Sequence, residues 1–341
     1  MQQLFQSPQA GPFGRRLRHS RGARVPVTVV TGFLGAGKTT LVKHFLQTPD
    51  GHGTAVVVNE FGATGIDDAL LRASADETVL LGNGCLCCNV RSDLQNALRR
   101  LVSERDRGEV PHFARVVIET SGLADPSPIL STFATDRALG GEFHVGSVVA
   151  VVDAVNGSAT LEAFPEARRQ VMLADRLILT KTDLADAAAV QVLVDRLRDL
   201  NARATIESVT NGQADPGCFL ENHDPVGGMP AGFVAEAVHG DDIRSFVLTE
   251  DAPLDWAVFA RTMDTLIGLR GPDLLRAKGF LDVQGCAGPV LVQFVQHLAH
   301  PPVELTAWPE GQRSSRVVFI TRNMAEREIR ALFEAVRALA R

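Results

Sequence analysis

The chain has 341 residues, of which 45% are apolar and 22% charged, and it carries a formal net charge of −6. This length favours two domains, and this composition is typical of a globular protein rather than of a disordered one. The acidic balance and the lack of tyrosine argue against nucleic acid as the partner, because such sites need basic charge and stacking rings.

Nothing in the sequence indicates a membrane or a secreted location. No stretch approaches the ~18 consecutive apolar residues of a membrane span, so no membrane partner is expected. The segment from Gly11 to Arg24 is rich in glycine and arginine without an apolar centre, which is unlike a secretory signal, and residues 1–24 carry several arginines. We expect them to form a basic tail without fixed structure, the alternative being a basic docking arm. The predicted location is cytoplasmic.

From residue 25 onward, short apolar strands alternate with longer amphipathic helices. The strands are continuous runs of Val, Ile and Leu, as in a parallel sheet that is covered on both faces. This alternation predicts a doubly wound α/β domain with a mostly parallel sheet over residues 25–212. The expected strands are 25–31, 54–59, 78–81, 115–120, 145–153, 176–180 and 204–208, and the expected helices are 38–47, 91–105 and 189–200.

The pattern changes after this domain. Gly, Pro, Asn and Asp dominate residues 211–230 without a period, so 213–242 is expected to be a linker. A small α+β domain is expected over 243–341. Its expected strands are 244–250, 275–285, 289–296 and 316–321, and its expected helices are 254–268 and 324–340.

The most specific motif is Gly-Phe-Leu-Gly-Ala-Gly-Lys-Thr-Thr at 32–40, which fits G-x-x-x-x-G-K-[ST] between a predicted strand and a predicted helix. Such a P-loop curls its backbone N–H groups around the β-phosphate, and the helix N-terminus adds partial positive charge. Lys38 can reach the β- and γ-phosphates, and Thr39 can offer a hydroxyl to Mg²⁺. The chain contains only four lysines, so a lysine at position 38 is not expected by chance. The alternative to a P-loop is a plain glycine turn between a strand and a helix. The predicted nucleotide contacts are Gly35, Ala36, Gly37, Lys38, Thr39 and Thr40.

A P-loop also needs an acidic group at the end of a neighbouring strand. Glu119 stands at the carboxyl end of the predicted strand 115–120, where ligands of such sheets bind. It can order Mg²⁺ and the attacking water, and Gly122 can bring its N–H to the γ-phosphate. The alternative for Glu119 is a surface carboxylate at a strand end. Lys38, Glu119 and Gly122 are thus the predicted catalytic residues.

Base recognition is predicted at Thr180-Lys181-Thr182-Asp183, which follows a buried strand. Asp183 can accept hydrogen bonds from the N1–H and the amino group of guanine, whereas adenine would leave that carboxylate unpaired. The stem of Lys181 can lie over the base plane. The usual first residue of this motif is Asn, so Thr180 requires its supporting hydrogen bonds to be rearranged. GTP is favoured over ATP.

Between the P-loop and Glu119 lies the segment 59–67, which leaves a strand through two glycines and carries acidic side chains, as a mobile switch loop would. Glu60 and Asp67 are its candidate ligands, Glu60 for a transition metal and Asp67 for Mg²⁺.

Three of the five cysteines lie within Cys85-Leu86-Cys87-Cys88, a cluster that indicates metal binding or redox chemistry in a reducing compartment rather than a disulfide framework. The cluster precedes a predicted helix, whose N-terminus favours thiolates. Three sulfur ligands suit tetrahedral Zn²⁺ or Cu(I). Candidates for a fourth ligand are Glu60, a nearby histidine, or a cysteine of a second subunit, which would make a homodimer. The alternatives are a strained Cys87–Cys88 disulfide and buried packing cysteines; packing is expected for Cys218 and Cys286.

Taken together, these segments resemble the CobW-like metal-chaperone GTPases, relatives of the nickel-handling HypB and UreG proteins. The resemblance covers about residues 25–341. It rests on GFLGAGKTT at 32–40, NEFGATGID at 59–67, GCLCC at 84–88, ETSGLADP at 119–126, ADRLILTKTDL at 174–184, LLRAKGFLDV at 274–283 and RVVFITRN at 316–323.

This resemblance implies a P-loop GTPase that binds zinc, or cobalt in some members, through the cysteine motif and transfers metal to a client metalloprotein. Two features differ from many relatives: Ala63 replaces a glutamate, and only scattered histidines, His223 and His239, stand where a histidine-rich stretch is common. Transfer is therefore expected rather than storage. No catalytic arginine or glutamine can be assigned, so the intrinsic rate should be slow. A P-loop small-molecule kinase and a binding-only sensor are the competing hypotheses.

Overall fold

The computed structural model describes residues 24–59, 79–82, 90–202, 204–210, 213–219, 237–239, 243–295, 298–299, 302–305, 308 and 313–339. The chain divides into two compact units. We call them the N-terminal unit (Arg24–Met229) and the C-terminal unit (Pro230–Arg341). The expected basic tail lies outside the described residues, except for Arg24.

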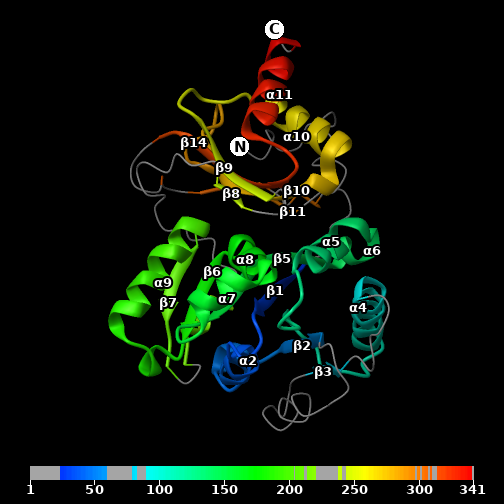
Figure 1. Cartoon of the computed structure of the whole chain (residues 1–341). Coiled ribbons are helices and arrows are strands. Elements are labelled where there is room, and N and C mark those ends of the chain that lie inside the picture. Colours follow the sequence, from blue (N-terminus) through cyan, green and yellow to red (C-terminus); the bar gives the residue numbers. More distant parts are fainter. Residues whose placement is uncertain are drawn as a thin grey trace. The chain divides into compact units, whose positions relative to one another are not determined.

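The N-terminal unit is built on a parallel sheet of seven strands in the order β3-β2-β4-β1-β5-β6-β7 (Figure 1). The central strands are almost wholly buried, which explains why they contain β-branched residues without polar alternation. The predicted doubly wound P-loop NTPase fold is confirmed. The strands are β1 (Val25–Gly32), β2 (Thr54–Asn59), β3 (Val79–Gly82), β4 (Arg115–Thr120), β5 (Phe143–Asp153), β6 (Arg176–Thr180) and β7 (Thr205–Ser208).

Helices pack on both faces of this sheet. On one face, α2 (Lys38–Leu46) buries Leu41, Val42 and Phe45 against strand residues such as Val151. On the opposite face lie α7 (Gly157–Ala163), α8 (Pro165–Leu173) and α9 (Ala187–Leu200), which pack against alternate residues of the same strands. Three further helices of this unit pack against one another: α4 (Val90–Asp106), α5 (Ser127–Thr135) and α6 (Arg137–Glu142).

The helices α5 to α8 were not predicted from the sequence. Each has nine residues or fewer, so none fills the 11–18-residue window in which helical periodicity can be recognised. Local signals were nonetheless present: Asp136 caps α6 through the N–H groups of Ala138 and Leu139, and Pro165 stands at the first position of α8. Within the described part of the chain, no helix is both long and apolar enough to cross a membrane.

The expected linker 213–242 needs correction at its beginning, because residues 213–219 pack into the core of the N-terminal unit. Cys218 and Phe219 are buried, and the ring of Phe219 stacks on that of Phe45 with centroids 4.2 Å apart. The hydroxyl of Thr28 donates a hydrogen bond of 2.8 Å to the carbonyl of Phe219. Burial raises the pKa of the Cys218 thiol to about 12, as suits the expected packing cysteine. The Gly- and Pro-rich composition concealed this anchoring.

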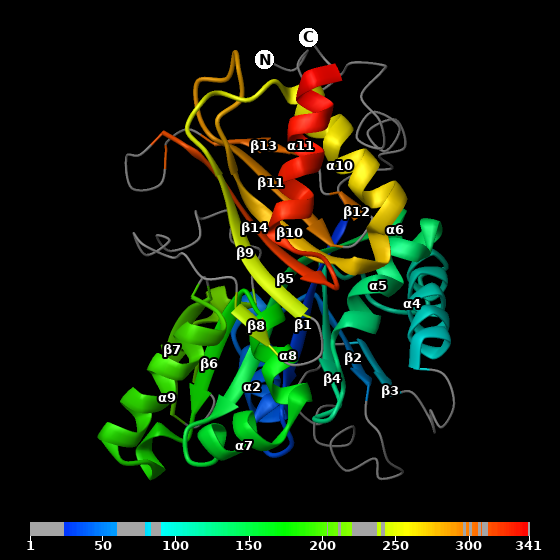
Figure 2. The same ribbon diagram turned by 45° about the horizontal axis from the view of Figure 1, so that its top comes forward.

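The C-terminal unit is an antiparallel sheet with two helices on one face, in agreement with the predicted α+β domain (Figure 2). The apolar sides of α10 (Trp256–Arg270) and α11 (Glu326–Leu339) cover Phe246, Ala277 and Phe319. One short strand, β8, lies within the expected linker and pairs with β9. The strands are β8 (Ala237–His239), β9 (Ile243–Glu250), β10 (Leu274–Leu281), β11 (Val290–Val295), β12 (Leu298–Ala299), β13 (Val303–Glu304) and β14 (Ser315–Arg322).

If residues 213–219 are part of the N-terminal core, Phe219→Ala should destabilise that unit by about 3 kcal/mol, through lost burial and the cavity left beside Phe45. Both tryptophans belong to the C-terminal unit, so unfolding is best followed by hydrogen exchange in β1 and β5. The exposed Val192→Ala serves as control. Equal exchange in the two variants would mean that this segment is a linker.

Candidate nucleotide-binding site

The predicted P-loop begins where the strand order of the sheet reverses. Strand β1 lies between β4 and β5; β2 and β3 continue on the β4 side, and β6 and β7 continue on the β5 side. Helices leave such a point in opposite directions, so a crevice forms at the carboxyl ends of the central strands. The loop from Gly32 to Gly37 leaves β1 at this position and leads into α2.

Glycine is required along this loop for two different reasons. Gly35 (φ 71°) and Gly37 (φ 98°) have left-handed backbone conformations, and Gly37 is the N-cap of α2. Gly32 (φ 142°) also lies so close to the carbonyl of Val151 in β5 that a Cβ atom would collide with it. The loop therefore curls tightly in front of the helix N-terminus, as an anion site requires.

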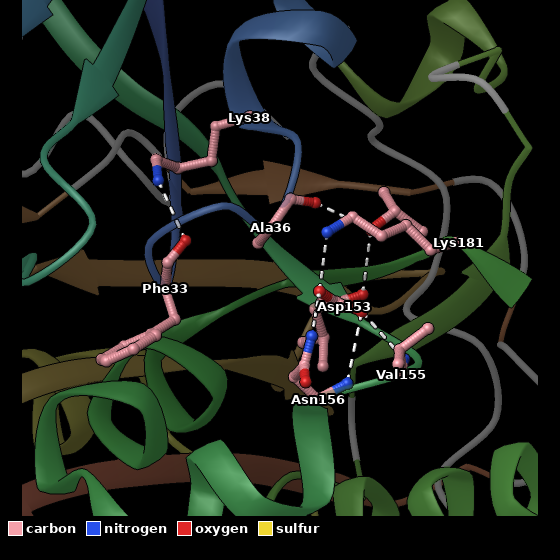
Figure 3. Close-up of polar contacts among 9 residues, drawn as sticks. Phe33, Ala36, Lys38, Asp153, Val155, Asn156 and Lys181 are labelled. Carbon is pink, nitrogen blue, oxygen red and sulfur yellow. Dashed lines mark hydrogen bonds and ion pairs between the residues drawn. The ribbon is translucent and has the colours of Figure 1, made fainter. Parts of the chain in front are cut away.

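Lys38 is the first residue of α2, and only 8% of it is exposed. Its Nζ donates hydrogen bonds to the carbonyls of Gly32 (3.0 Å) and Phe33 (3.2 Å), as Figure 3 shows for Phe33. The ammonium is thus directed back over the loop that precedes it. This is the placement expected of a lysine that contacts nucleotide phosphates.

Thr39 and Glu119 meet although 80 positions separate them in sequence. The Thr39 hydroxyl donates a 2.6 Å hydrogen bond to Oε1 of Glu119, which is 5% exposed near the end of β4. A hydroxyl and a carboxylate at a helix N-terminus are oxygen donors of the kind that Mg²⁺ prefers, with phosphates and water as its other ligands. The described residues therefore fit a Mg²⁺ ion at this point.

Gly122 touches the P-loop from the side of β4. A Cβ atom at Gly122 would lie 2.7 Å from both N and Cα of Leu34, so no larger residue fits without displacing the loop. The carbonyls of Gly122 and Ala124 accept hydrogen bonds from the side chain of Gln170 on α8. Sequence reasoning missed Gln170, because a single glutamine in an unpredicted helix carries no recognisable pattern.

The predicted base-recognition residues lie on the β6 side of the loop. The Thr180 hydroxyl donates a 2.7 Å hydrogen bond to the carbonyl of Ala36, so it links β6 to the P-loop. Lys181 has a left-handed backbone (φ 59°), and its Nζ donates to Asp153 at 2.7 Å (Figure 3). Asp183 is exposed in a short 3₁₀ turn, Thr182–Leu184, where its carboxylate is accessible.

Comparison with known proteins agrees with this geometry. Residues 26–208 match the CobW/HypB/UreG nucleotide-binding domain, and residues 243–337 match the cobalamin synthesis protein CobW C-terminal domain. The chain belongs to the CobW/HypB/UreG family.

Two relatives extend the family resemblance over almost the whole chain. The zinc chaperone YjiA of Escherichia coli is 38% identical over 320 residues, covering 92% of this chain and 99% of its own. The zinc chaperone CobW of Sinorhizobium is 30% identical over 356 residues, covering 92% and 97%. The crystal structure of Zn(II)-bound YjiA GTPase from E. coli matches with a TM-score of 0.65 and 33% identity, over 92% of this chain and 99% of that one.

The predicted ligands of the family's metal are not described by the structure. Cys85, Cys87, Cys88 and Glu60 all lie outside the described residues, as does Asp67, the candidate ligand for Mg²⁺. Among the residues that are described, no group of three or more His, Cys, Asp or Glu side chains could hold a metal ion. The metal-site assignment therefore stays a prediction.

The predicted nucleotide contact Thr40 is described, and it is exposed in the first turn of α2.

Asp153, at the end of β5, was missed by the sequence analysis, although it supports Lys181. Burial by itself would raise the pKa of Asp153, but hydrogen bonds outweigh this and lower the pKa below its ordinary value. The donors are the Lys181 ammonium, the Asn156 amide, and the backbone N–H groups of Val155 and Asn156. Asp153 thus holds the loop after β5 and the lysine after β6 together.

Because the pKa of Asp153 is lower in the folded than in the unfolded chain, its carboxylate should stabilise the fold at neutral pH. This contribution should be lost as pH falls below about 4, where the group becomes protonated. We expect Asp153→Asn to lower the free energy of unfolding at pH 7 by about 1–3 kcal/mol. When urea unfolding is followed by circular dichroism, the difference in the free energy of unfolding between Asp153→Asn and wild type should shrink toward pH 3.5. Asp199→Asn, at an exposed position of α9, is the control; a pH-independent difference would contradict this role.

Proposed function

We propose that this protein is a GTP-hydrolysing metallochaperone of the cytoplasm, which uses Mg²⁺ with GTP, binds zinc as its cargo and delivers it to a client metalloprotein. The observation that carries the GTPase part is the hydrogen bond between Thr39 and Glu119. It joins the start of the P-loop helix to the end of β4, and these two points must come together to bind and hydrolyse a Mg²⁺-nucleotide.

Each part of the site would act on a different part of the nucleotide. Backbone N–H groups from Gly35 to Thr40 and the Lys38 ammonium would bind the phosphates. Thr39 and Glu119 would hold the Mg²⁺ ion, which neutralises charge on the phosphate oxygens when bound. Gly122 would direct its N–H toward the γ-phosphate.

Guanine selectivity would come from residues on β6 and just after it. Asp183 is exposed and could accept two hydrogen bonds from guanine, while the stem of Lys181 would lie over the base. The contact from Thr180 to Ala36 would align this recognition segment with the phosphate loop, and the carboxylate of Asp183 favours GTP over ATP. A slow intrinsic rate is expected.

The metal part of the proposal is supported by the cysteine motif and by the named activities of relatives. Besides the two zinc chaperones, a zinc-regulated GTPase metalloprotein activator of Schizosaccharomyces pombe is 36% identical over 198 residues. Here Cys85, Cys87 and Cys88 would bind the zinc, with Glu60 or a cysteine of a second copy in a homodimer as fourth ligand. Because this loop precedes β4 in the chain, metal binding could be transmitted to Glu119. Co²⁺ is the alternative cargo.

The metal proposal can be tested by titrating the purified protein with Zn²⁺ and Co²⁺ while metal stoichiometry and GTP hydrolysis are measured. We expect one tightly bound Zn²⁺ per cysteine cluster and a rate of GTP hydrolysis that depends on this ion. Changing Cys85, Cys87 and Cys88 to Ala together should abolish both effects and leave the Kd for GTP within about twofold. Cys286→Ala is the matched control, since that cysteine is buried in the C-terminal core. If the triple variant retains zinc affinity and the metal-dependent rate, the coupling is wrong.

Base recognition gives a second test through Asp183→Asn. The N–H₂ group of an asparagine and the amino group of guanine are both hydrogen-bond donors, so they repel each other. The same N–H₂ group can donate to the 2-oxo group of xanthine. GTP should therefore bind roughly 100-fold more weakly, while XTP should bind more tightly than it does to wild type. Competition binding with GTP, XTP and ATP measures both changes, with Asp199→Asn as control. A wild-type preference for ATP would instead favour the small-molecule kinase.

A further inference from the structure

Helix α8 lies against the loop that connects β4 to α5, and a buried glutamine donates two hydrogen bonds to that loop. Only 1% of Gln170 is exposed. Its Nε2 donates a hydrogen bond of 3.1 Å to the carbonyl of Gly122 and another of 3.0 Å to the carbonyl of Ala124. A glutamine amide has two N–H donors, so both are used on this loop.

The neighbouring residues reinforce the contact. On the same helix, Nη1 of Arg169 lies 3.5 Å from Oδ2 of Asp125. The other oxygen of Asp125 accepts hydrogen bonds from the backbone and the hydroxyl of Ser127, at the start of α5. Three residues of the loop, Gly122, Ala124 and Asp125, are thus connected to two adjacent residues of α8.

On its other side the loop meets the P-loop. A Cβ atom at Gly122 would lie 2.7 Å from the backbone of Leu34, so Gly122 is enclosed between the P-loop and Gln170. Gln170 also lines a cavity of about 250 Å³ between the P-loop, β5, α7 and α8, together with Phe33 and Asp153. Gln170 therefore lies between this cavity and the loop that carries Gly122 and Ala124.

We propose that Gln170 is a positioning residue for GTP hydrolysis: by holding the carbonyls of Gly122 and Ala124, it orients the Gly122 N–H toward the γ-phosphate. The inference rests on the proposed GTPase function. Donors aimed at developing charge are effective only when held in place before reaction, and a displacement of about 1 Å can cost up to 100-fold in rate. Gln170 itself need not touch the nucleotide. Its effect should therefore fall on kcat, with little change in nucleotide binding.

The first test is Gln170→Met, which keeps a long unbranched side chain and removes both donors. We expect kcat for GTP hydrolysis to fall about tenfold or more, while the Kd for GTP and for GDP changes by less than about threefold. Gln191→Met is the matched control, because Gln191 is exposed on α9 and bonds only to Asp195 of its own helix in the described contacts. An unchanged kcat, or an equal loss of nucleotide binding, overturns the proposal.

The second test is Gln170→Glu, read as a pH profile. A protonated glutamic acid can donate to one loop carbonyl, whereas the carboxylate can donate to neither. Burial beside carbonyl oxygens should raise the pKa of this group, so the ratio of variant to wild-type kcat should fall at least about threefold between pH 6 and pH 8. The charged groups near this position, Asp125, Asp153 and Arg169, are present in both proteins, so a pH effect that arises from their own titration appears in both profiles. A constant ratio would mean that Gln170 merely fills space.

A third measurement does not depend on hydrolysis. Amide hydrogen exchange of residues 122–125 should be faster in Gln170→Met than in wild type, while β1 and β5 keep their protection. Unchanged exchange at 122–125 overturns the inference. If wild type binds GTP without hydrolysing it, the proposed GTPase function fails, and the exchange experiment still decides whether Gln170 holds the loop.

Discussion

The site depends on how closely neighbouring segments approach the backbone between β1 and α2. Gly32 lies against the carbonyl of Val151, and Gly122 lies against the backbone of Leu34. The Thr180 hydroxyl bonds to the carbonyl of Ala36 from a third direction. The first two contacts are possible because Gly32 and Gly122 have no side chain, and Gly35 and Gly37 give the loop its left-handed backbone. A loop of this shape directs its amides into one crevice.

Several described segments around the crevice touch this loop or the helix that follows it, so a movement in one would affect the others. Strand β4 brings Glu119 to Thr39 at the start of α2, the following loop brings Gly122 to Leu34, and β5 brings Val151 to Gly32. Packed contacts of this kind favour discrete arrangements over gradual deformation. That property suits a protein whose metal site is proposed to respond to bound nucleotide, since small changes at the phosphates could be transmitted along β4.

Buried polar groups within the N-terminal unit show where specificity required hydrogen bonds in place of apolar packing. Gln170, Thr180 and Asp153 are each less than 10% exposed, yet each bonds to a loop at the carboxyl edge of the sheet. A buried polar group is costly unless its partners are placed correctly. These side chains therefore favour one arrangement of the loops over the alternatives that apolar contacts alone would permit.

The sequence by itself determined the parallel sheet and the P-loop, because hydrophobic runs and the spacing from Gly32 to Lys38 are local properties. It also predicted a base-recognition segment at 180–183. It also indicated Glu119, which stands at a strand end. Local pattern could not find Gln170 or Asp153, since their partners lie 48 and 28 residues away. Nor could it show that Phe219, in a segment that reads as linker, stacks on Phe45. Only the tertiary structure decided these contacts, because the sheet brings distant residues together and no periodicity records that proximity.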